Sequence, residues 1–143
     1  MRTKTQILPG VSRIGWLDCR FLAPYVSLQY ICGMKVSVMT DIHFIPEFED
    51  ASCECSTKVN GAGLSATAIL KFRTNAIIPD NGYLAFVVTT PGGENYLIGS
   101  QERPYATMEC DHSTGDPSAD AAGYEYEIKH VAIRSMIPCV IGY

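Results

Sequence analysis

The stretch that decides the fold is YLAFVVTTPGGENYLIG, residues Tyr83–Gly99. Its first half is rich in β-branched and aromatic residues, which favour strands. Pro91 then fixes φ at the entrance to a turn, and Gly92 and Gly93 accept positive φ without a Cβ penalty. Apolar residues return at Tyr96. The stretch therefore predicts a β-hairpin whose turn lies at residues 91–95.

Outward from the hairpin, apolar and polar residues alternate with period two, which is typical of strands with one buried face. This alternation predicts strands at residues 26–30, 36–44, 66–73 and 124–133. Only residues 61–70 allow a short helix, and the alternation through Phe72 favours a strand there. In the predicted last strand, 124–133, the parity slips at Lys129–His130, which predicts a β-bulge. We expect loops at residues 46–52 and 111–123.

These patterns predict an all-β protein, an antiparallel β-sandwich or barrel of about eight strands. A length of 143 residues suits a single domain. We assign residues 1–24 to an N-terminal arm or first strand and residues 25–143 to one β domain. The apolar group Ile14-Gly15-Trp16-Leu17 is a candidate for packing on a neighbouring copy.

Composition excludes several classes of protein. Hydrophobic residues make up 47% and charged residues 18%, which does not fit a disordered chain or a coiled coil. The apolar runs are far shorter than the roughly 20 residues that span a bilayer, so we expect no membrane partner. A net charge of −4 gives no basic footprint for direct nucleic-acid recognition. Pro9 and Arg13 interrupt any signal-like apolar region, so we expect synthesis and folding in a cytoplasm.

Charge is distributed unevenly along the chain. Residues 1–40 hold five basic and one acidic side chain (+4), and residues 94–127 hold eight acidic and one basic (−7). The alternatives are ordinary scatter over solvated faces, or a protomer with ends of opposite sign that pairs head to tail. The second alternative predicts these interface residues: Arg2, Lys4, Arg13, Glu102, Glu109, Asp111, Asp116 and Asp120.

The best metal candidate combines Cys53 and Cys55 with Cys110 and His112. Residues i and i+2 of a strand share a face, so the two pairs could supply four tetrahedral zinc ligands. Against this, structural zinc sites usually have two-residue spacers, and the six cysteines are irregularly spaced. We expect most of them to be buried thiols and expect no cofactor.

The sequence gives less support to calcium binding and to nucleophilic catalysis. The acidic loop residues Asp111, Asp116 and Asp120 lack the spacing of a calcium loop. A nucleophilic site would need Ser113 or a cysteine beside His43, His112 or His130, with an orienting carboxylate. The chain has no Gly-x-Ser-x-Gly elbow to build such a site. We therefore expect a protein that is not an enzyme.

Residues 82–138 resemble the small virion proteins of tailed bacteriophages and prophages, especially those of Bacteroides-type hosts. The features that carry the resemblance are Tyr96–Ser100 after the glycine turn, Pro104-Tyr105, the acidic loop Ser113–Asp116, and Ala122–Tyr126 before the predicted last strand. The resemblance implies a non-enzymatic structural protein of the viral tail or head–tail connector. It also implies a homo-oligomeric ring within the virion that contacts other virion proteins, and it brings no catalytic residues.

A carbohydrate- or ligand-binding β-sandwich module is the alternative. Eight tyrosines and Trp16 provide side chains with an apolar body and a polar tip, which suit sugar-binding platforms as well as subunit interfaces. This alternative predicts an exposed aromatic platform near residues 91–95 or beside Trp16.

Overall fold

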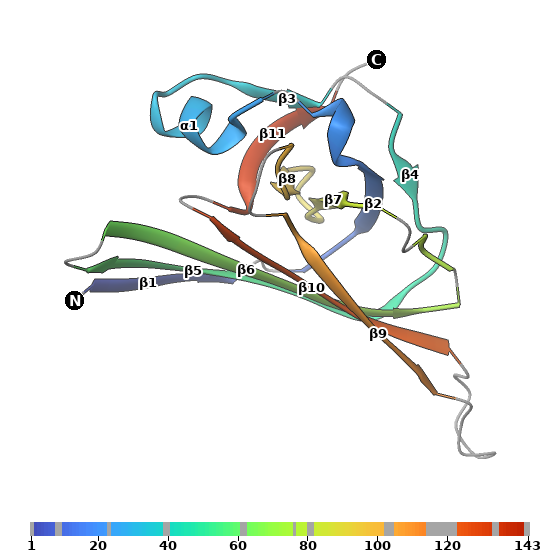
Figure 1. Cartoon of the computed structure of the whole chain (residues 1–143). Coiled ribbons are helices and arrows are strands. Elements are labelled where there is room, and N and C mark those ends of the chain that lie inside the picture. The colour runs from blue at the N-terminus through green and yellow to red at the C-terminus, as the bar shows by residue number, and fades with distance from the viewer. Residues whose placement is uncertain are drawn as a thin grey trace.

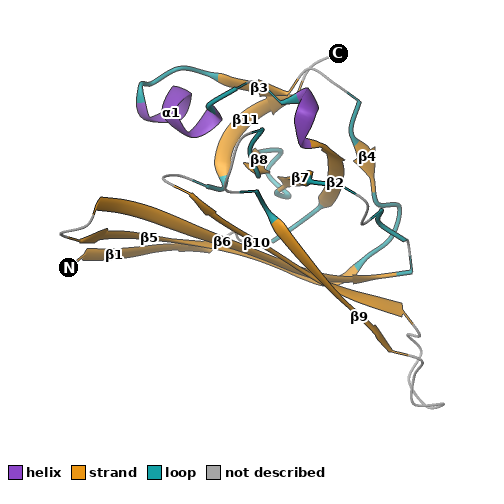
Figure 2. Cartoon of the chain, in the orientation of Figure 1, coloured by secondary structure: helices purple, strands orange, loops and turns teal. Residues whose placement is uncertain are grey.

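The structure is a computed structural model. It describes residues 2–7, 10–22, 24–38, 41–60, 63–75, 77–79, 82–101, 105–113, 123–132 and 135–141. These residues confirm the all-β prediction, with eleven strands in place of about eight (Figure 2). The elements are β1 (Arg2–Ile7), β2 (Arg13–Asp18), the 3-10 turn η1 (Cys19–Phe21), α1 (Val26–Ile31), β3 (Val36–Val38), β4 (His43–Phe44), β5 (Glu49–Asn60), β6 (Gly63–Thr74), β7 (Leu84–Thr89), β8 (Asn95–Ile98), β9 (Thr107–Ser113), β10 (Gly123–Ala132) and β11 (Ile137–Ile141).

The strands form two sheets that lie one above the other (Figure 1). The longer strands build a five-stranded sheet in the order β1-β5-β6-β10-β9, in which every neighbouring pair is antiparallel. The second sheet curls and has the order β3-β11-β8-β7-β2-β4. Its β3–β11 pair is parallel and its other pairs are antiparallel.

The predicted hairpin is confirmed as β7 and β8. Phe86 pairs with Ile98 and Thr89 with Asn95, and the turn between them includes Gly93 at φ 89°. The Gly93 amide donates to the Thr90 carbonyl at 2.9 Å. Both faces of these strands are buried, which explains why their sequence is continuously apolar.

The buried residues form two clusters, one on each side of the hairpin. Phe86 and Ile98 belong to the cluster between the two sheets, together with Leu70, Phe72 and other inward residues of the long sheet. Val87 and Leu97 face the opposite way, into the curl of the second sheet, where they pack with Val26 and its neighbours. Burying both faces of one hairpin makes it the centre of the core.

The predicted β-bulge at Lys129–His130 is wrong. β10 pairs with β6 without interruption from Tyr124 opposite Thr74 to Ala132 opposite Ala66. His130, not Val131, takes the inward position, which a hydrophobicity pattern misassigns. The irregular register of the sheet lies instead in β5, between Glu49 and Ser52.

The strand predicted at residues 26–30 is also wrong, because this segment forms α1. The Gln29 amide donates to the Tyr25 carbonyl at 2.9 Å, and the Cys32 amide donates to the Leu28 carbonyl at 3.0 Å. Val26 is buried in the curl, whereas Leu28 and Tyr30 are exposed. The apparent alternation therefore has no common buried face, and hydrogen bonds within the helix satisfy the backbone.

Other boundaries need correction. The apolar group at residues 14–17 lies in β2, where Ile14 and Leu17 are buried in the protein's own core and not against a neighbour. The loop predicted at 46–52 ends earlier, because β5 begins at Glu49. The loop predicted at 111–123 is also shorter, because β9 extends to Ser113 and β10 begins at Gly123. Residues 114–122 lie outside the described residues. The chain also continues beyond the predicted last strand into β11.

Candidate assembly interface

β9 forms one edge of the long sheet, and within the described residues it pairs only with β10. Glu109 lies directly opposite Glu127, and Asp111 lies directly opposite Glu125. Like charges directly opposite each other destabilise an antiparallel pair. Glu109 is exposed at this edge. The β9 edge is therefore acidic and is not neutralised by its neighbour β10.

The rest of the long sheet alternates in charge from strand to strand. From the sequences of the strands, the net charges are +2 for β1, −2 for β5, +2 for β6, −1 for β10 and −2 for β9. Lys71 on β6 accordingly lies opposite Glu127, and Arg73 lies opposite both Glu125 and Glu49. The alternation fails only between β10 and β9.

β1 forms the other edge of the same sheet and contains two basic residues, Arg2 and Lys4. Because all five strands are antiparallel to their neighbours, the first and last strands, β1 and β9, run in the same direction. The sheet thus has a basic edge at β1 and an acidic edge at β9, and the two edge strands run in the same direction.

The other predicted interface residues are placed differently. Arg13 lies on β2 in the second sheet, where its guanidinium is 4.4 Å from the centre of the Phe44 ring. This cation–π contact engages Arg13 with its own chain. Glu102, Asp116 and Asp120 lie outside the described residues. Asp111, Arg2 and Lys4 are placed by their backbone alone.

The four candidate zinc ligands do not share one site. Cys53 and Cys55 lie on β5, whereas Cys110 and His112 lie on β9, three strands away. At about 4.8 Å per strand, that separation is about 14 Å. Among the described residues, no three His, Cys, Asp or Glu side chains are grouped as a metal site requires.

The two β5 thiols serve the core instead. The Cys53 Sγ atom is 3.6 Å from the Met136 Sδ atom, and the Cys55 thiol donates to the Ser135 carbonyl at 3.6 Å. Burial raises the pKa of Cys53 to about 12, so it stays protonated at neutral pH. The prediction that most cysteines are buried thiols is confirmed, since only Cys32 and Cys110 are exposed.

Two of the candidate histidines are placed by their side chains. His130 is only 1% exposed and lies between Ser100 and Ser135, where a substrate could not reach it. His43 is exposed and stacks on Trp16, with ring centroids 4.4 Å apart. The backbones of His112 and Ser113 lie on β9, and their side chains are outside the described part of the structure.

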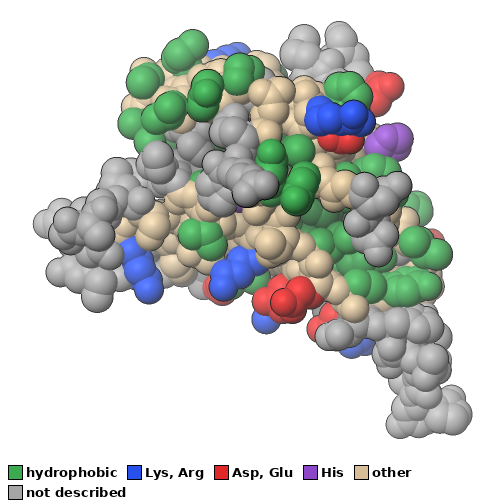
Figure 3. Space-filling model, in the orientation of Figure 1, with side chains coloured by type: hydrophobic (Ala, Val, Ile, Leu, Met, Phe, Trp, Pro, Cys, Tyr) green, Lys and Arg blue, Asp and Glu red, His purple; other side chains and the backbone are tan. Residues whose placement is uncertain are grey.

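Sequence reasoning missed an exposed apolar surface on α1, which we call the α1 surface. Large hydrophobic side chains gather over this helix in the space-filling view (Figure 3). Its members are Tyr25, Leu28, Tyr30, Ile31 and Met34. The available signal was the absence of any acidic residue from 19 to 40. Within the described chain, no helix has the length and apolar character needed to cross a membrane.

Comparison with known proteins assigns the chain to no family. No family model matches the chain, and no curated protein or solved structure is significantly similar to it.

Proposed function

We propose that this chain is a non-enzymatic structural protein that assembles head to tail with copies of itself. The proposal follows the resemblance to phage virion proteins. The protein is made in the host cytoplasm and built into a ring or tube of the tail or neck, beside other virion proteins. The observation that carries it is the opposite charge of the two edges of one continuous sheet.

The edge charges distinguish between modes of pairing. A symmetric contact between two β9 strands would bring Glu109 and Asp111 of both copies together, and two β1 strands would bring Arg2 and Lys4 together. Both contacts are repulsive. A head-to-tail contact places a strand of +2 beside a strand of −2 and continues the alternation of charge across the boundary. Such a heterologous contact closes into a ring or extends into a tube, according to the rotation between copies.

Edge strands also favour a pairing partner for a second reason. Their outward N–H and C=O groups are unpaired in a monomer and provide a template for another strand. β9 is seven residues long, enough for a substantial ladder with β1 of a neighbour. The charges select the partner, and the backbone hydrogen bonds hold it.

Light scattering across a salt series tests the proposal. We expect a discrete oligomer at about 0.05 M salt that weakens as salt screens the edges. Glu109→Lys with Asp111→Lys should weaken it at low salt, and adding Lys4→Glu should restore part of the loss. Glu54→Lys is the matched control, because Glu54 is exposed on the interior strand β5. A monomer at low salt and high concentration contradicts the proposal.

The carbohydrate-binding alternative is supported by a different observation. Tyr83 and Tyr105 stack with ring centroids 4.1 Å apart, and Tyr83 is 55% exposed. Tyr83 thus presents an exposed ring that is backed by the partly buried Tyr105, and such a ring can stack on the apolar face of a sugar. Glycan-array binding that Tyr83→Ala abolishes would support this function, and an array without a hit would remove it.

A further inference from the structure

The α1 surface is unusual because α1 turns most of its apolar side chains outward. Of the large hydrophobic residues from Tyr25 to Met34, Val26 is buried at 1% exposure, while the five members of the surface are 41–59% exposed. Isolated exposed apolar residues are normal, but a contiguous group of this size marks an interaction site.

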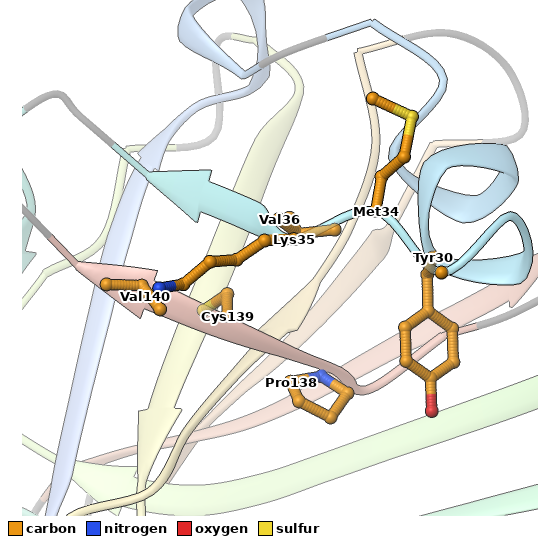
Figure 4. A pocket seen from close by; sticks show the side chains of 8 residues that line it. Tyr30, Met34, Lys35, Val36, Pro138, Cys139 and Val140 are labelled. Carbon is orange, nitrogen blue, oxygen red and sulfur yellow. The ribbon is translucent and has the colours of Figure 1, made fainter.

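A shallow hollow of about 300 Å³ adjoins the helix (Figure 4). The Tyr30 side chain projects from α1 at one side of the hollow, and Pro138 and Val140 of β11 form the other side. Met34 lines it from the chain that links α1 to β3. The α1 surface thus places a projecting apolar helix beside a mainly apolar hollow, which Lys35 also lines.

The backbone at the start of the helix gives a second sign of function. Tyr25 has φ 55° and ψ 46°, the left-handed backbone conformation that residues other than glycine rarely adopt. Its side chain is 59% exposed. Strained residues of this kind concentrate at functional sites. Here the strain places an aromatic ring on the surface.

We propose that the α1 surface joins two copies of this chain around a two-fold axis, with the helix of each copy over the hollow of the other. A two-fold contact requires that one patch contain both the projection and its complement, and α1 and the hollow meet that requirement. The five side chains expose roughly 500 Å² in total. Buried against the same surface of a second copy, these side chains would cover roughly 1,000 Å² in total, the lower limit of a specific interface. This contact rests on different residues from the charged edges and does not depend on them.

A second copy fits the surface better than a lipid bilayer does. Recognition of anionic lipids uses clusters of about four to eight basic residues, whereas residues 19–40 contain only Arg20 and Lys35. α1 is also only six residues long, shorter than the helices that lie in a membrane interface. The hollow beside the helix can receive a projecting element of another protein surface, whereas binding to lipid tails does not require a hollow.

Sedimentation of the full chain in about 0.5 M salt tests this contact, because salt weakens the charged edges but not an apolar contact. We expect a dimer that Leu28→Glu weakens at least tenfold. Ile77→Glu is the matched control, since Ile77 is 73% exposed in the connection between β6 and β7. The control and the Glu109→Lys/Asp111→Lys variant should both keep the dimer. Thermal unfolding of each variant checks that it folds.

Cross-linking gives an independent result. Cys32 closes α1 at its C-terminal end and is exposed. In a Cys110→Ser background, a short bis-maleimide should therefore join two chains through Cys32 and yield dimers only. A monomer in high salt overturns the inference, as does a dimer that survives Leu28→Glu. It is also overturned if a monomer binds vesicles of phosphatidylcholine and phosphatidylserine and Leu28→Glu abolishes that binding. Loss of the salt-sensitive oligomer alone would contradict only the proposed function.

Discussion

The Nδ1 atom of His130 lies 2.6 Å from the hydroxyl oxygen of Ser135, and both residues are buried. His130 belongs to β10 of the long sheet, and Ser135 lies in the connection to β11 of the second sheet. The Ser100 hydroxyl is 3.5 Å from the other ring nitrogen, and the Ser135 carbonyl accepts from Cys55. This polar cluster therefore stabilises the segment in which the chain passes from the long sheet to the second sheet.

Removing the hydroxyl from this cluster should destabilise the fold. Ser135→Ala removes the 2.6 Å partner of the buried Nδ1 atom, and loss of a hydrogen bond to a buried polar group costs about 1–3 kcal/mol. Urea unfolding measures the loss. Ser52→Ala, on an exposed position of β5, should change the free energy of unfolding by less than about 0.5 kcal/mol. Equal effects for the two variants would show that the His130–Ser135 contact contributes little.

Gly99 tolerates no side chain, for two reasons. Its φ is 132°, and a Cβ atom there would lie 2.8 Å from the Cβ of Ala85 and 3.0 Å from its Cα. Gly99→Ala should therefore destabilise the protein by about 1–3 kcal/mol, because the strand that must give way is the buried β7. Gly82→Ala is the control, since nothing lies within 4 Å of a Cβ at that position. A wild-type melting temperature for Gly99→Ala would contradict this account.

The thiols should divide into two groups by reactivity. Burial raises the pKa of Cys53 and of Cys139 to about 12, and Cys19 and Cys55 are also buried. Reaction with an aromatic disulfide reagent at pH 8 should modify Cys32 and Cys110 quickly, and all six thiols only in denaturant. Rapid modification of more than two thiols in the native protein would argue against this core packing.

The same thiols should make stability fall in alkali. Unfolding returns Cys139 to its ordinary pKa of 9.0 from about 12, so between these values the folded state binds more protons. Its contribution is complete below pH 9 and is lost as the pH rises towards 12. Cys139→Val should reduce the fall in unfolding free energy over this range by up to about 1.4 kcal/mol per pH unit. Identical pH profiles for variant and wild type would contradict the shift.

Replacing Tyr25 should affect folding and association in opposite directions. Tyr25→Gly relieves the left-handed strain at φ 55° and should raise the free energy of unfolding of the monomer by up to about 1 kcal/mol. The same change removes an exposed ring from the α1 surface and should weaken the dimer. Thermal unfolding and sedimentation of the one variant measure both effects. A variant with unchanged dimerisation would exclude Tyr25 from the contact.

Parts of this fold were predictable because their signal is local. Pro91, Gly92 and Gly93 define a turn by their own backbone preferences, and the alternation from Ala66 to Phe72 identifies a strand with one buried face. The α1 segment was not predictable in this way. Its alternation resembles that of a strand, but Leu28 and Tyr30 are exposed, so the apolar residues of the pattern do not mark a buried face.

The sequence by itself determined the all-β class, the central hairpin, the burial of most thiols and the uneven charge, because each depends on composition or on neighbours within a few residues. Only the tertiary structure decided that β1 and β9 are the two edges of one sheet. It also decided that Cys53 and Cys55 lie three strands from Cys110 and His112, and that His130 faces inward. These features depend on which distant segments pair, as when Ile14 meets Val88. The free energy of such pairing comes from burial against residues that no local window contains.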